Sequence, residues 1–398
     1  MPSATAVAQQ DRALYDRLAT LNDPPFTAAQ RGAALDTFFA TRSGREKPSR
    51  YWRVDFETLQ PTSAQLDASD VTIEVDNPND GVAVYDLAVA ARERPELLGR
   101  AFGRTGAHAT KFGALAAAFA RRGVFIHVPA DRAPGEPIVI RSSTAANSAA
   151  FPAIVVLVER GARLTVIEHI DAASNAFVCG TTEIVCDEGA QVTYAVVQAA
   201  AEDARVLFTR AALPGRNARV LWADAELGAA LAAGDLSIEI EEPGSESEIV
   251  ALFFPNGSQH VDVVSTVHHR AGDATSLTLV KSAGTDRGQA RFLGNIRIAE
   301  GAQGSDARLR DDALLLSTAA HVDSVPALEI AANDVKAYHG ATVGAIDDEQ
   351  IFYMESRGIE RSAAERMIAL GFFEPAIARF PTERVRDSIR QALAAKLT

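Results

Sequence analysis

His339 is the residue whose surroundings most strongly suggest chemistry. It lies in the stretch NDVKAYHGATVG (333–344), between an acidic strand start and a glycine-flanked turn, and Asp323, Glu329 and Asp334 precede it. A neutral imidazole can bind a metal while a carboxylate or backbone carbonyl holds its second nitrogen, and it can also act as a general base or pack in a core. The residues do not decide which carboxylate would support it, so His339 is a candidate ligand and the packing interpretation stays open.

The other metal-binding residue types form no convincing site. Cys179 and Cys186 have six residues between them, whereas paired zinc-binding cysteines are usually about two to four residues apart. Their apolar, strand-like flanks predict small buried side chains. His268 and His269 are adjacent in an expected strand, so they point to opposite faces and cannot chelate one metal together.

Sequence motifs for common enzymes are missing. The chain has no G-x-x-x-x-G-K-[ST] phosphate loop, no G-x-S-x-G elbow and no H-E-x-x-H. The acidic run EIEEPGSESE (239–248) could supply carboxylates for polysaccharide cleavage, but it spans a Pro-Gly turn, where charges are usually solvated. An intracellular β-helix carbohydrate lyase or hydrolase remains an alternative, and it predicts paired carboxylates about 5–10 Å apart in one groove.

Composition sets the class of protein. The 398 residues are 47% hydrophobic and 23% charged, as in soluble globular proteins, and the net charge is −13. Without a basic stripe the chain is not expected to bind nucleic acid. No apolar run approaches the ~20 residues of a membrane helix, and the N-terminus has no signal-like segment, which predicts a cytoplasmic protein with no membrane partner.

The segment 124–346 carries a repeat. Short β-branched runs alternate with turn glycines whose separations are 28, 26, 29, 28 and 29 residues; they are Gly161, Gly189, Gly215, Gly244, Gly272 and Gly301. Such a period indicates stacked units that cannot bury their apolar faces alone. We therefore expect a mainly β protein with a β-helix of about seven coils, with a sandwich of evenly spaced turns as the alternative.

Helical patterns flank this core. We expect a region at 1–123 that is mostly helical with a few strands: helices in 5–41, split by Pro24-Pro25, then strands at 50–56 and 71–76, then helices at 95–103 and 109–122.

A C-terminal helical region is expected at 347–398. SAAE (362–365) is typical of a capping box, and Thr382 is the expected N-cap of the last helix. In that helix Val385, Ile389 and Leu393 form an apolar stripe. The stripe either packs on the β-helix or a neighbouring helix, or binds a partner.

Two long stretches resemble a known family. ALEIAANDVKAYHGATVG (327–344), with the following IFYMESRGIERSAAERMIALGFF, is similar to the C-terminal signature of the SufB/SufD family of SUF iron–sulfur cluster assembly scaffolds. KFGALAAAFARRGVFIHVPADRAPGEPI (111–138) resembles the family's entry into its β-helix. The length and the HGATVG form are closer to the SufD branch than to the longer SufB branch.

The resemblance implies a right-handed parallel β-helix between helical ends, and a scaffold rather than an enzyme. It implies pairing with a SufB-like paralogue and binding of a SufC-like ABC ATPase through 347–398, which would give Val385, Ile389 and Leu393 a partner. It also implies a transient iron–sulfur cluster at the subunit interface, with His339 as this chain's ligand and a cysteine from the partner. A homodimer is possible in isolation, and no nucleotide is expected on this chain itself.

Ligand counting agrees with a shared site. Iron–sulfur clusters mostly take four ligands, largely cysteine thiolates, and this chain has only two cysteines, far from His339 in sequence. The position two residues before His339 is Ala337, where some relatives carry cysteine. An inert oligomeric β-solenoid is the remaining alternative, and it predicts that His339 is replaceable.

Overall fold

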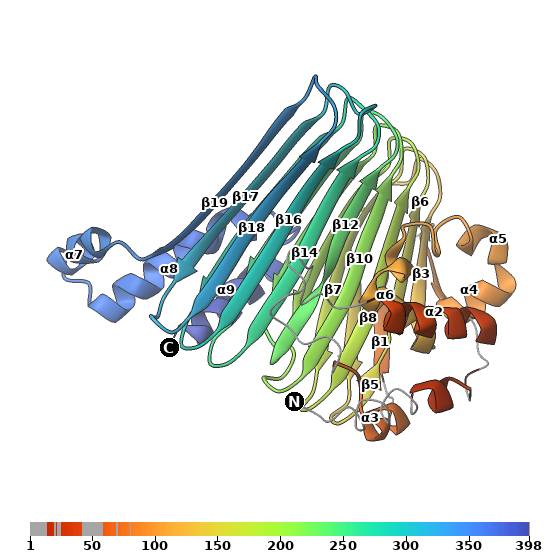
Figure 1. The fold of residues 1–398 in the computed structure, drawn as a ribbon, viewed down its shortest axis with the longest axis horizontal. Coiled ribbons are helices and arrows are strands. Elements are labelled where there is room, and N and C mark those ends of the chain that lie inside the picture. The colour runs from red at the N-terminus through yellow and green to blue at the C-terminus, as the bar shows by residue number, and fades with distance from the viewer. Residues whose placement is uncertain are drawn as a thin grey trace.

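The computed structural model describes residues 14–19, 21, 25–41, 59–68, 71–79 and 81–397. Its centre is a β-solenoid of about 8 turns, in line with the expected β-helix of about seven coils. Figure 1 shows the strands stacked side by side, with helices from the two ends of the chain flanking them. The predicted strand at 50–56 lies outside the described residues, as does part of the helical segment at 5–41.

Two sheets form the walls of the solenoid. Within the described residues sheet A has nine strands; in spatial order they are β1 (Val71–Asp76), β4 (Ile138–Thr144), β7 (Arg163–Ala172), β9 (Gln191–Gln198), β11 (Arg219–Glu226), β13 (Glu246–Phe253), β15 (Thr275–Gly284), β17 (Asp306–Leu315) and β19 (Lys336–Ala345).

Sheet B has ten strands in the same described part; in spatial order they are β2 (Ala83–Asp86), β3 (Gly123–Val128), β6 (Ala153–Val158), β8 (Phe177–Cys186), β10 (Arg205–Pro214), β12 (Leu231–Ile240), β14 (His260–His269), β16 (Gln289–Ile298) and β18 (His321–Ile330), with β5 (Ala149–Ala150) beside β8. Among the described strands, β1 and β2 alone pair antiparallel with their neighbours, and the other pairings are parallel. Each coil therefore contributes one strand to each sheet.

The register aligns like residues along the solenoid axis. Because side chains alternate across a strand, aligned residues of parallel neighbours face the same side. Tyr194, Trp222 and Ile249 are aligned on β9, β11 and β13 and are all buried inside the lumen. Stacked apolar side chains of this kind form the main core, and lost contact with water stabilises each by roughly 1.5–3 kcal/mol.

Left-handed backbone recurs at one corner of each coil. Positive φ angles occur 27 to 31 residues apart, at Asp131, Gly161, Gly189, Asn217, Gly244, Asp273 and Gly304. Glycine and Asn or Asp tolerate this conformation best, which explains the repeat in the sequence. Gly215 and Gly272 are needed for another reason: an added Cβ would lie 2.7 Å and 2.3 Å from a carbonyl oxygen of the adjoining coil.

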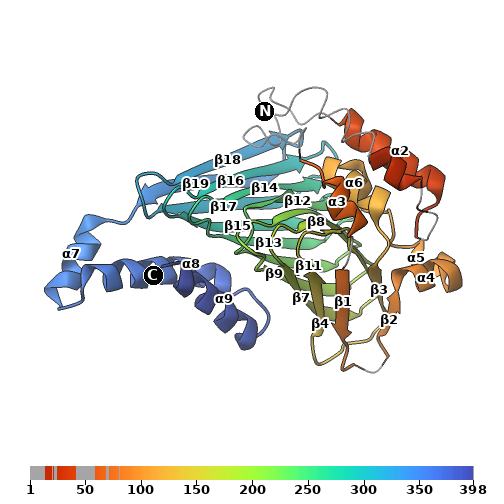
Figure 2. The same ribbon diagram turned by 90° about the horizontal axis from the view of Figure 1, so that it is seen from below.

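The helices cover the outer faces of the sheets rather than the ends of the solenoid. The N-terminal helices are α2 (Ala28–Ala40), α3 (Ser63–Asp67), α4 (Leu87–Glu93), α5 (Pro95–Leu98), η1 (Ala107–Ala109) and α6 (Lys111–Phe119). Phe112 and Leu115 of α6 pack on Phe177 and Leu207, on the outer face of sheet B. Figure 2 shows α8 and α9 on the opposite side, along sheet A.

The C-terminal helices are α7 (Asp348–Ser356), α8 (Arg361–Ile377) and α9 (Glu383–Lys396). The predicted N-cap Thr382 is confirmed, since its hydroxyl accepts a hydrogen bond from the Val385 amide. The predicted capping box at Ser362 is wrong. Helix α8 begins earlier, with Glu360 as N-cap, so Ser362 lies inside the first turn and donates to the Glu360 carboxylate.

None of the helices in the described part of the chain is both long and apolar enough to cross a lipid bilayer.

Candidate functional site

His339 lies on β19, the last strand of sheet A, and its side chain is exposed. It is aligned with Leu309 of β17, a core residue that points into the lumen. His339 therefore faces the lumen side at the open end, where no further coil formed by the described residues covers it. Tyr338 points to the outside, where its ring lies over Gly340: a Cβ there would meet the Tyr338 hydroxyl at 2.6 Å.

In the described part of the chain, none of the three carboxylates near His339 in sequence forms a hydrogen bond or ion pair with it. Glu329 forms an ion pair with Arg297 on the outer face of sheet B (3.1 Å). The Asp323 carboxylate lies 2.9 Å from the His321 imidazole. Asp334 lies in the turn before β19, and its backbone amide donates to the side-chain oxygen of Gln303. Across the described ranges, no hydrogen bond or ion pair joins His339 to another side chain, so its imidazole is available to a ligand.

Asp311 and Ser324, which the sequence interpretation missed, lie beneath this end. Asp311 of β17 is on the lumen face, 1% exposed, and accepts a hydrogen bond from Ser324 of β18 through Oδ2. Burial raises the pKa of the Asp311 carboxyl to about 7. The signal was present: in DARLRDDALL, Ala307, Leu309 and Asp311 share the inward period of two, which places a carboxylate where an apolar residue is expected.

A second buried polar group lies deeper in the lumen. Arg210 of β10 donates to Asp224 and to Glu226 of β11 (2.8 Å to Glu226), and the Tyr194 hydroxyl donates to Glu168 (2.7 Å). Burial, with the Asp224 charge adding to it, raises the pKa of Glu226 to about 8, and burial also raises the pKa of Glu168. One guanidinium cannot neutralise three carboxylates, so Glu226 is expected to be protonated near neutral pH.

The cysteines are structural. Cys179 and Cys186 are free and buried, and the Cys179 thiol donates to the Phe112 carbonyl under α6 (3.3 Å). Burial raises the pKa of both thiols well above the usual range. Neither is accessible as a thiolate ligand, in agreement with their interpretation as small buried residues.

The adjacent histidines face opposite sides of β14, as predicted. His268 pairs with Glu239 on the outside (3.1 Å), whereas His269 is in the lumen, 2.8 Å from the Ser276 hydroxyl. Burial lowers the pKa of His269 to about 4, so it is neutral. Carboxylates of the acidic run 239–248 pair with exposed arginines: Glu239 with Arg270, Glu246 with Arg219 and the buried Glu248 with Arg379.

The apolar stripe of the last helix faces its own chain. Val385, Ile389 and Leu393 are 3%, 0% and 0% exposed and pack with Phe373 and Phe254 on the outer face of sheet A. The sequence left open whether the stripe packs within the chain or binds a partner, and the structure shows that it packs within the chain. Because these side chains are fully covered, they are not free to contact a partner in this conformation.

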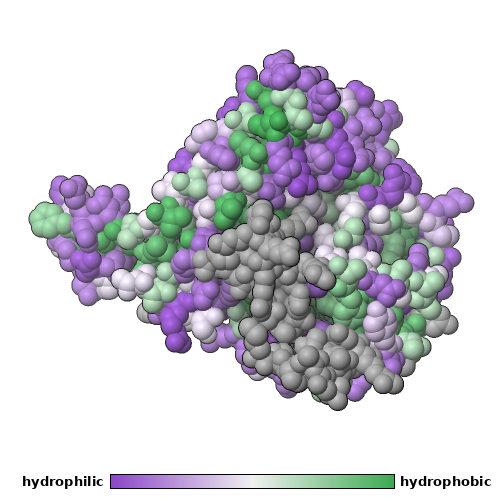
Figure 3. Space-filling view, in the orientation of Figure 1, coloured by the Kyte–Doolittle hydropathy of each residue, from purple (hydrophilic) through white to green (hydrophobic). Residues whose placement is uncertain are grey.

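Exposed apolar side chains occur instead on the projecting arm, which we define as α7 and the first turns of α8 (residues 348–370). Phe352, Tyr353 and Met367 are 72%, 59% and 55% exposed. Figure 1 shows α7 standing away from the solenoid, and Figure 3 shows apolar atoms on the arm among polar ones. Large exposed apolar residues that cluster in this way are typical of interaction surfaces.

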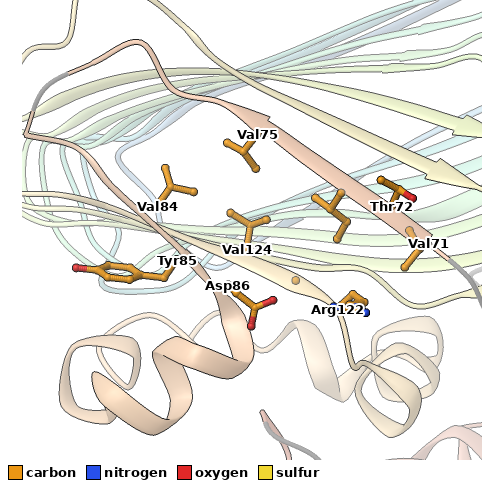
Figure 4. Close-up of a pocket in the computed structure, with 10 residues that line it drawn as sticks. Val71, Thr72, Val75, Val84, Tyr85, Asp86, Arg122 and Val124 are labelled. Atoms are coloured by element: carbon orange, nitrogen blue, oxygen red, sulfur yellow. The ribbon is translucent and has the colours of Figure 1, made fainter.

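A pocket of about 510 Å³ lies at the other end of the solenoid, between β1 and β2. Val75, Val84 and Val124 line it, as Figure 4 shows. Its acidic residue, Asp86, already caps α4 by accepting from the Ala88 and Val89 amides. Thr72, Asp86 and Arg122 line the pocket beside the valines. Because the Asp86 carboxylate is already used as a helix cap, the pocket is a weaker candidate site than the end that carries His339.

Comparison with known proteins identifies the family of this chain. Residues 140–372 match the family model described as SUF system FeS cluster assembly, SufBD core domain. The chain belongs to the SufB/SufD family. Its relatives include proteins called iron–sulfur cluster assembly SufBD family protein from Staphylococcus saprophyticus, Staphylococcus epidermidis and Staphylococcus aureus; each is 26% identical over 332 residues, which covers 82% of this chain and 71% of the relative. This SufB/SufD chain thus has the general scaffold role of a family that assembles iron–sulfur clusters.

Proposed function

We propose that this chain is a non-enzymatic, SufD-like scaffold subunit that pairs with a SufB-like subunit and lends His339 to a nascent iron–sulfur cluster at their interface. The observation that carries the proposal is the position of His339: an exposed imidazole on a ten-residue strand that ends its sheet. A residue there can reach into whatever covers the end of the solenoid.

The open end has the features of a strand-pairing surface. Strands β18 and β19 are each ten residues long and close the spatial order of their sheets, so their outer edges present backbone amides and carbonyls that another chain can pair with. Ile330 and Val343 are 41% and 44% exposed there. A second β-helix docked on these edges would cover both residues and His339.

The ligand count supports a shared cluster. With Cys179 and Cys186 buried away from the open end, and Ala337 two residues before His339, this chain supplies one imidazole and no thiolate there. The partner would supply cysteine, as clusters usually require. Mixed ligation from two chains would bind the cluster less firmly than four thiolates and would suit its transfer.

The projecting arm is the proposed contact for the SufC-like ATPase. It replaces Val385, Ile389 and Leu393 as the partner surface, because Phe352, Tyr353 and Met367 are exposed and those three are buried. Helix α8 continues from the arm onto sheet A, against β13 and β15. Movement of the arm on ATP binding would change the interface with the SufB-like subunit only if the bound nucleotide favours one arrangement of the sheets over another.

The test is cluster formation on the reconstituted complex. His339→Ala should lower the yield of iron–sulfur cluster, read from visible absorption and bound sulfide, by several-fold or more, while size-exclusion chromatography shows an intact complex. His321→Ala is a matched control, because His321 is also exposed but lies on the outer face of β18. An unchanged yield in His339→Ala removes the ligand role.

A further inference from the structure

We propose that Asp311 is a second iron ligand of this chain, and that Asp311 with His339 forms the chain's half of a ferrous-iron site inside the open end of the lumen. The inference rests on the proposed function and deepens it: it gives the site a carboxylate and assigns it to the metal ion before sulfide arrives.

The register brings the two residues together. Asp311 is aligned with Ala341 of β19, and His339 precedes Ala341 by two residues on the same face. With strands about 4.8 Å apart and a rise of about 3.3 Å per residue, the Cα atoms of Asp311 and His339 are roughly 8 Å apart. From that separation, two inward-facing side chains can reach one ion through bonds of about 2.1 Å, the length usual for zinc with nitrogen or carboxylate oxygen.

The Asp311 carboxylate has an unsatisfied oxygen. Its Oδ2 accepts from Ser324, whereas its Oδ1 is buried and has no hydrogen-bond partner among the described residues. A buried carboxylate oxygen without a partner is costly in free energy. A bound cation would remove that cost.

The neighbouring carboxylate does not compete for this role. Asp312 faces outward and is paired with Lys281 and Arg310, each at 2.8 Å. Of the two adjacent acids, Asp311 alone lies in the lumen, and it has no cationic side chain within ion-pair distance in the described part of the molecule. Its charge is therefore uncompensated when it is ionised.

An ion would reach Asp311 from the open end. The residue aligned above Asp311 is Ala341, whose side chain is one methyl group and which is exposed. On the solenoid side, Leu309 closes the lumen below His339: it reaches across to β16, where a Cβ at Gly294 would lie 2.3 Å from its Cδ1. An ion would thus be held between the last two coils and remain within reach of a docked partner.

The donor set indicates the kind of ion. One imidazole nitrogen and one carboxylate oxygen suit divalent first-row metals such as ferrous iron, whereas a complete cluster prefers thiolates. We therefore assign the pair to iron loading, with the remaining positions filled by water in the isolated chain and by the partner in the complex.

The experiment measures cation binding by the isolated full chain under anaerobic conditions. Co²⁺ serves as the probe, followed by its visible ligand-field absorption, and Fe²⁺ uptake is measured by equilibrium dialysis. Asp311→Asn and His339→Ala should each lower the affinity about 10-fold or more, the range seen when metal-site partners are removed. Asp306→Asn is the matched control on the outer face of β17, where Asp306 pairs with Arg308, and it should bind like the wild type.

A second variant guards against a folding effect. Ala341→Leu places a larger side chain over Asp311 from an exposed position, leaves both ligands intact, and should weaken Co²⁺ binding as well. Thermal unfolding shows whether each variant is folded. Wild-type affinity in Asp311→Asn, with weak binding in His339→Ala, would overturn the Asp311 assignment and leave the proposed function standing.

No Co²⁺ uptake by the wild type, or uptake unaffected by any of these variants, would also overturn the inference. The proposed function is judged separately, by cluster yield in the complex that carries His339→Ala.

Discussion

The two ends of the solenoid differ in how they finish the sheets. At the N-terminal end, β1 and β2 are short, six and four residues, and both run antiparallel to their neighbours. Glu74 and Asp76 are exposed on β1, which hinders the addition of another strand. Ile73, Val75 and Val84 pack against the core from this end.

At the C-terminal end, β18 and β19 continue the parallel order of their sheets at the full length of ten residues. Ile330 of β18 and Tyr338 and Val343 of β19 are exposed on these strands, as is His339. The N-terminal end therefore disfavours the addition of another strand, whereas the C-terminal end offers two long strand edges on which another chain can pair. Four predictions test this contrast, from the largest effect to the smallest.

Charges on the C-terminal edge should prevent pairing. Ile330→Lys combined with Val343→Lys removes two exposed apolar contacts and should weaken binding of the SufB-like subunit by about 100- to 1,000-fold, since central apolar contacts each contribute about 2 kcal/mol or more. Isothermal titration calorimetry measures the affinity. Thr72→Lys, on the exposed face of β1, is the control and should leave affinity unchanged; equal losses would erase the distinction between the ends.

The C-terminal helices should separate into a structural and a partner-binding part. Leu393→Ala creates a cavity under α9 and should lower the free energy of unfolding by about 2–5 kcal/mol. Phe352→Ala, on the arm, should change it by less than about 0.5 kcal/mol but weaken ATPase binding. Denaturant unfolding and a pull-down of the ATPase distinguish the two, and normal ATPase binding by the Phe352 variant would remove the arm from the proposal.

The closed lumen between the ends should give a pH-dependent stability. Burial raises the pKa of Glu226 to about 8 in the folded chain, whereas the unfolded value is about 4.3. The protonated form therefore stabilises the fold at low pH, and this contribution is lost as pH rises through about 8, a change of roughly 2 kcal/mol or more.

Glu226→Gln should flatten that profile, because glutamine cannot ionise. Urea unfolding at pH 6 and pH 8.5 measures the difference, and Glu246→Gln, exposed on the outside of β13, should keep the wild-type profile. Parallel profiles for the wild type and Glu226→Gln would mean that Glu226 is already ionised at pH 6.

The smallest effect is expected at the N-terminal mouth. Val84→Ala removes a partly buried side chain from the pocket in Figure 4 and should cost about 1 kcal/mol of stability. It should not alter the affinity for the SufB-like subunit. A loss of affinity without a loss of stability would show that this end also takes part in assembly.

Much of the fold could be predicted from local pattern. Glycine spacing in 161–301 revealed the coil repeat. Gly161, Gly189 and Gly244 have left-handed backbone at a recurring corner, and Gly215 and Gly272 leave no room for a Cβ between adjoining coils. Thr382 marked the start of α9 through its hydroxyl. The capping box predicted at Ser362 was wrong. The same residue pattern can occur inside the first turn of a helix that begins earlier, as α8 does with Glu360 as its N-cap.

The candidate site, too, was predicted only in part from the sequence. His339 was identified from its motif, but the supporting carboxylates were sought near it in sequence, and Glu329 pairs with Arg297 on the outer face instead. Asp311 lies one coil earlier along the chain and comes close only through the strand register. Linear proximity says little in a solenoid, where spatial neighbours are one repeat apart.

By itself, the sequence determined the coil repeat, the helical flanks and the scarcity of sulfur ligands, and it singled out His339 as the candidate ligand, because each depends on residue type and short-range spacing. Only the tertiary structure decided that Val385, Ile389 and Leu393 are buried, that the C-terminal edge is open, and that Asp311 lies beneath it. These depend on which faces the stacked strands and helices present to one another, and that is set by packing over the whole chain.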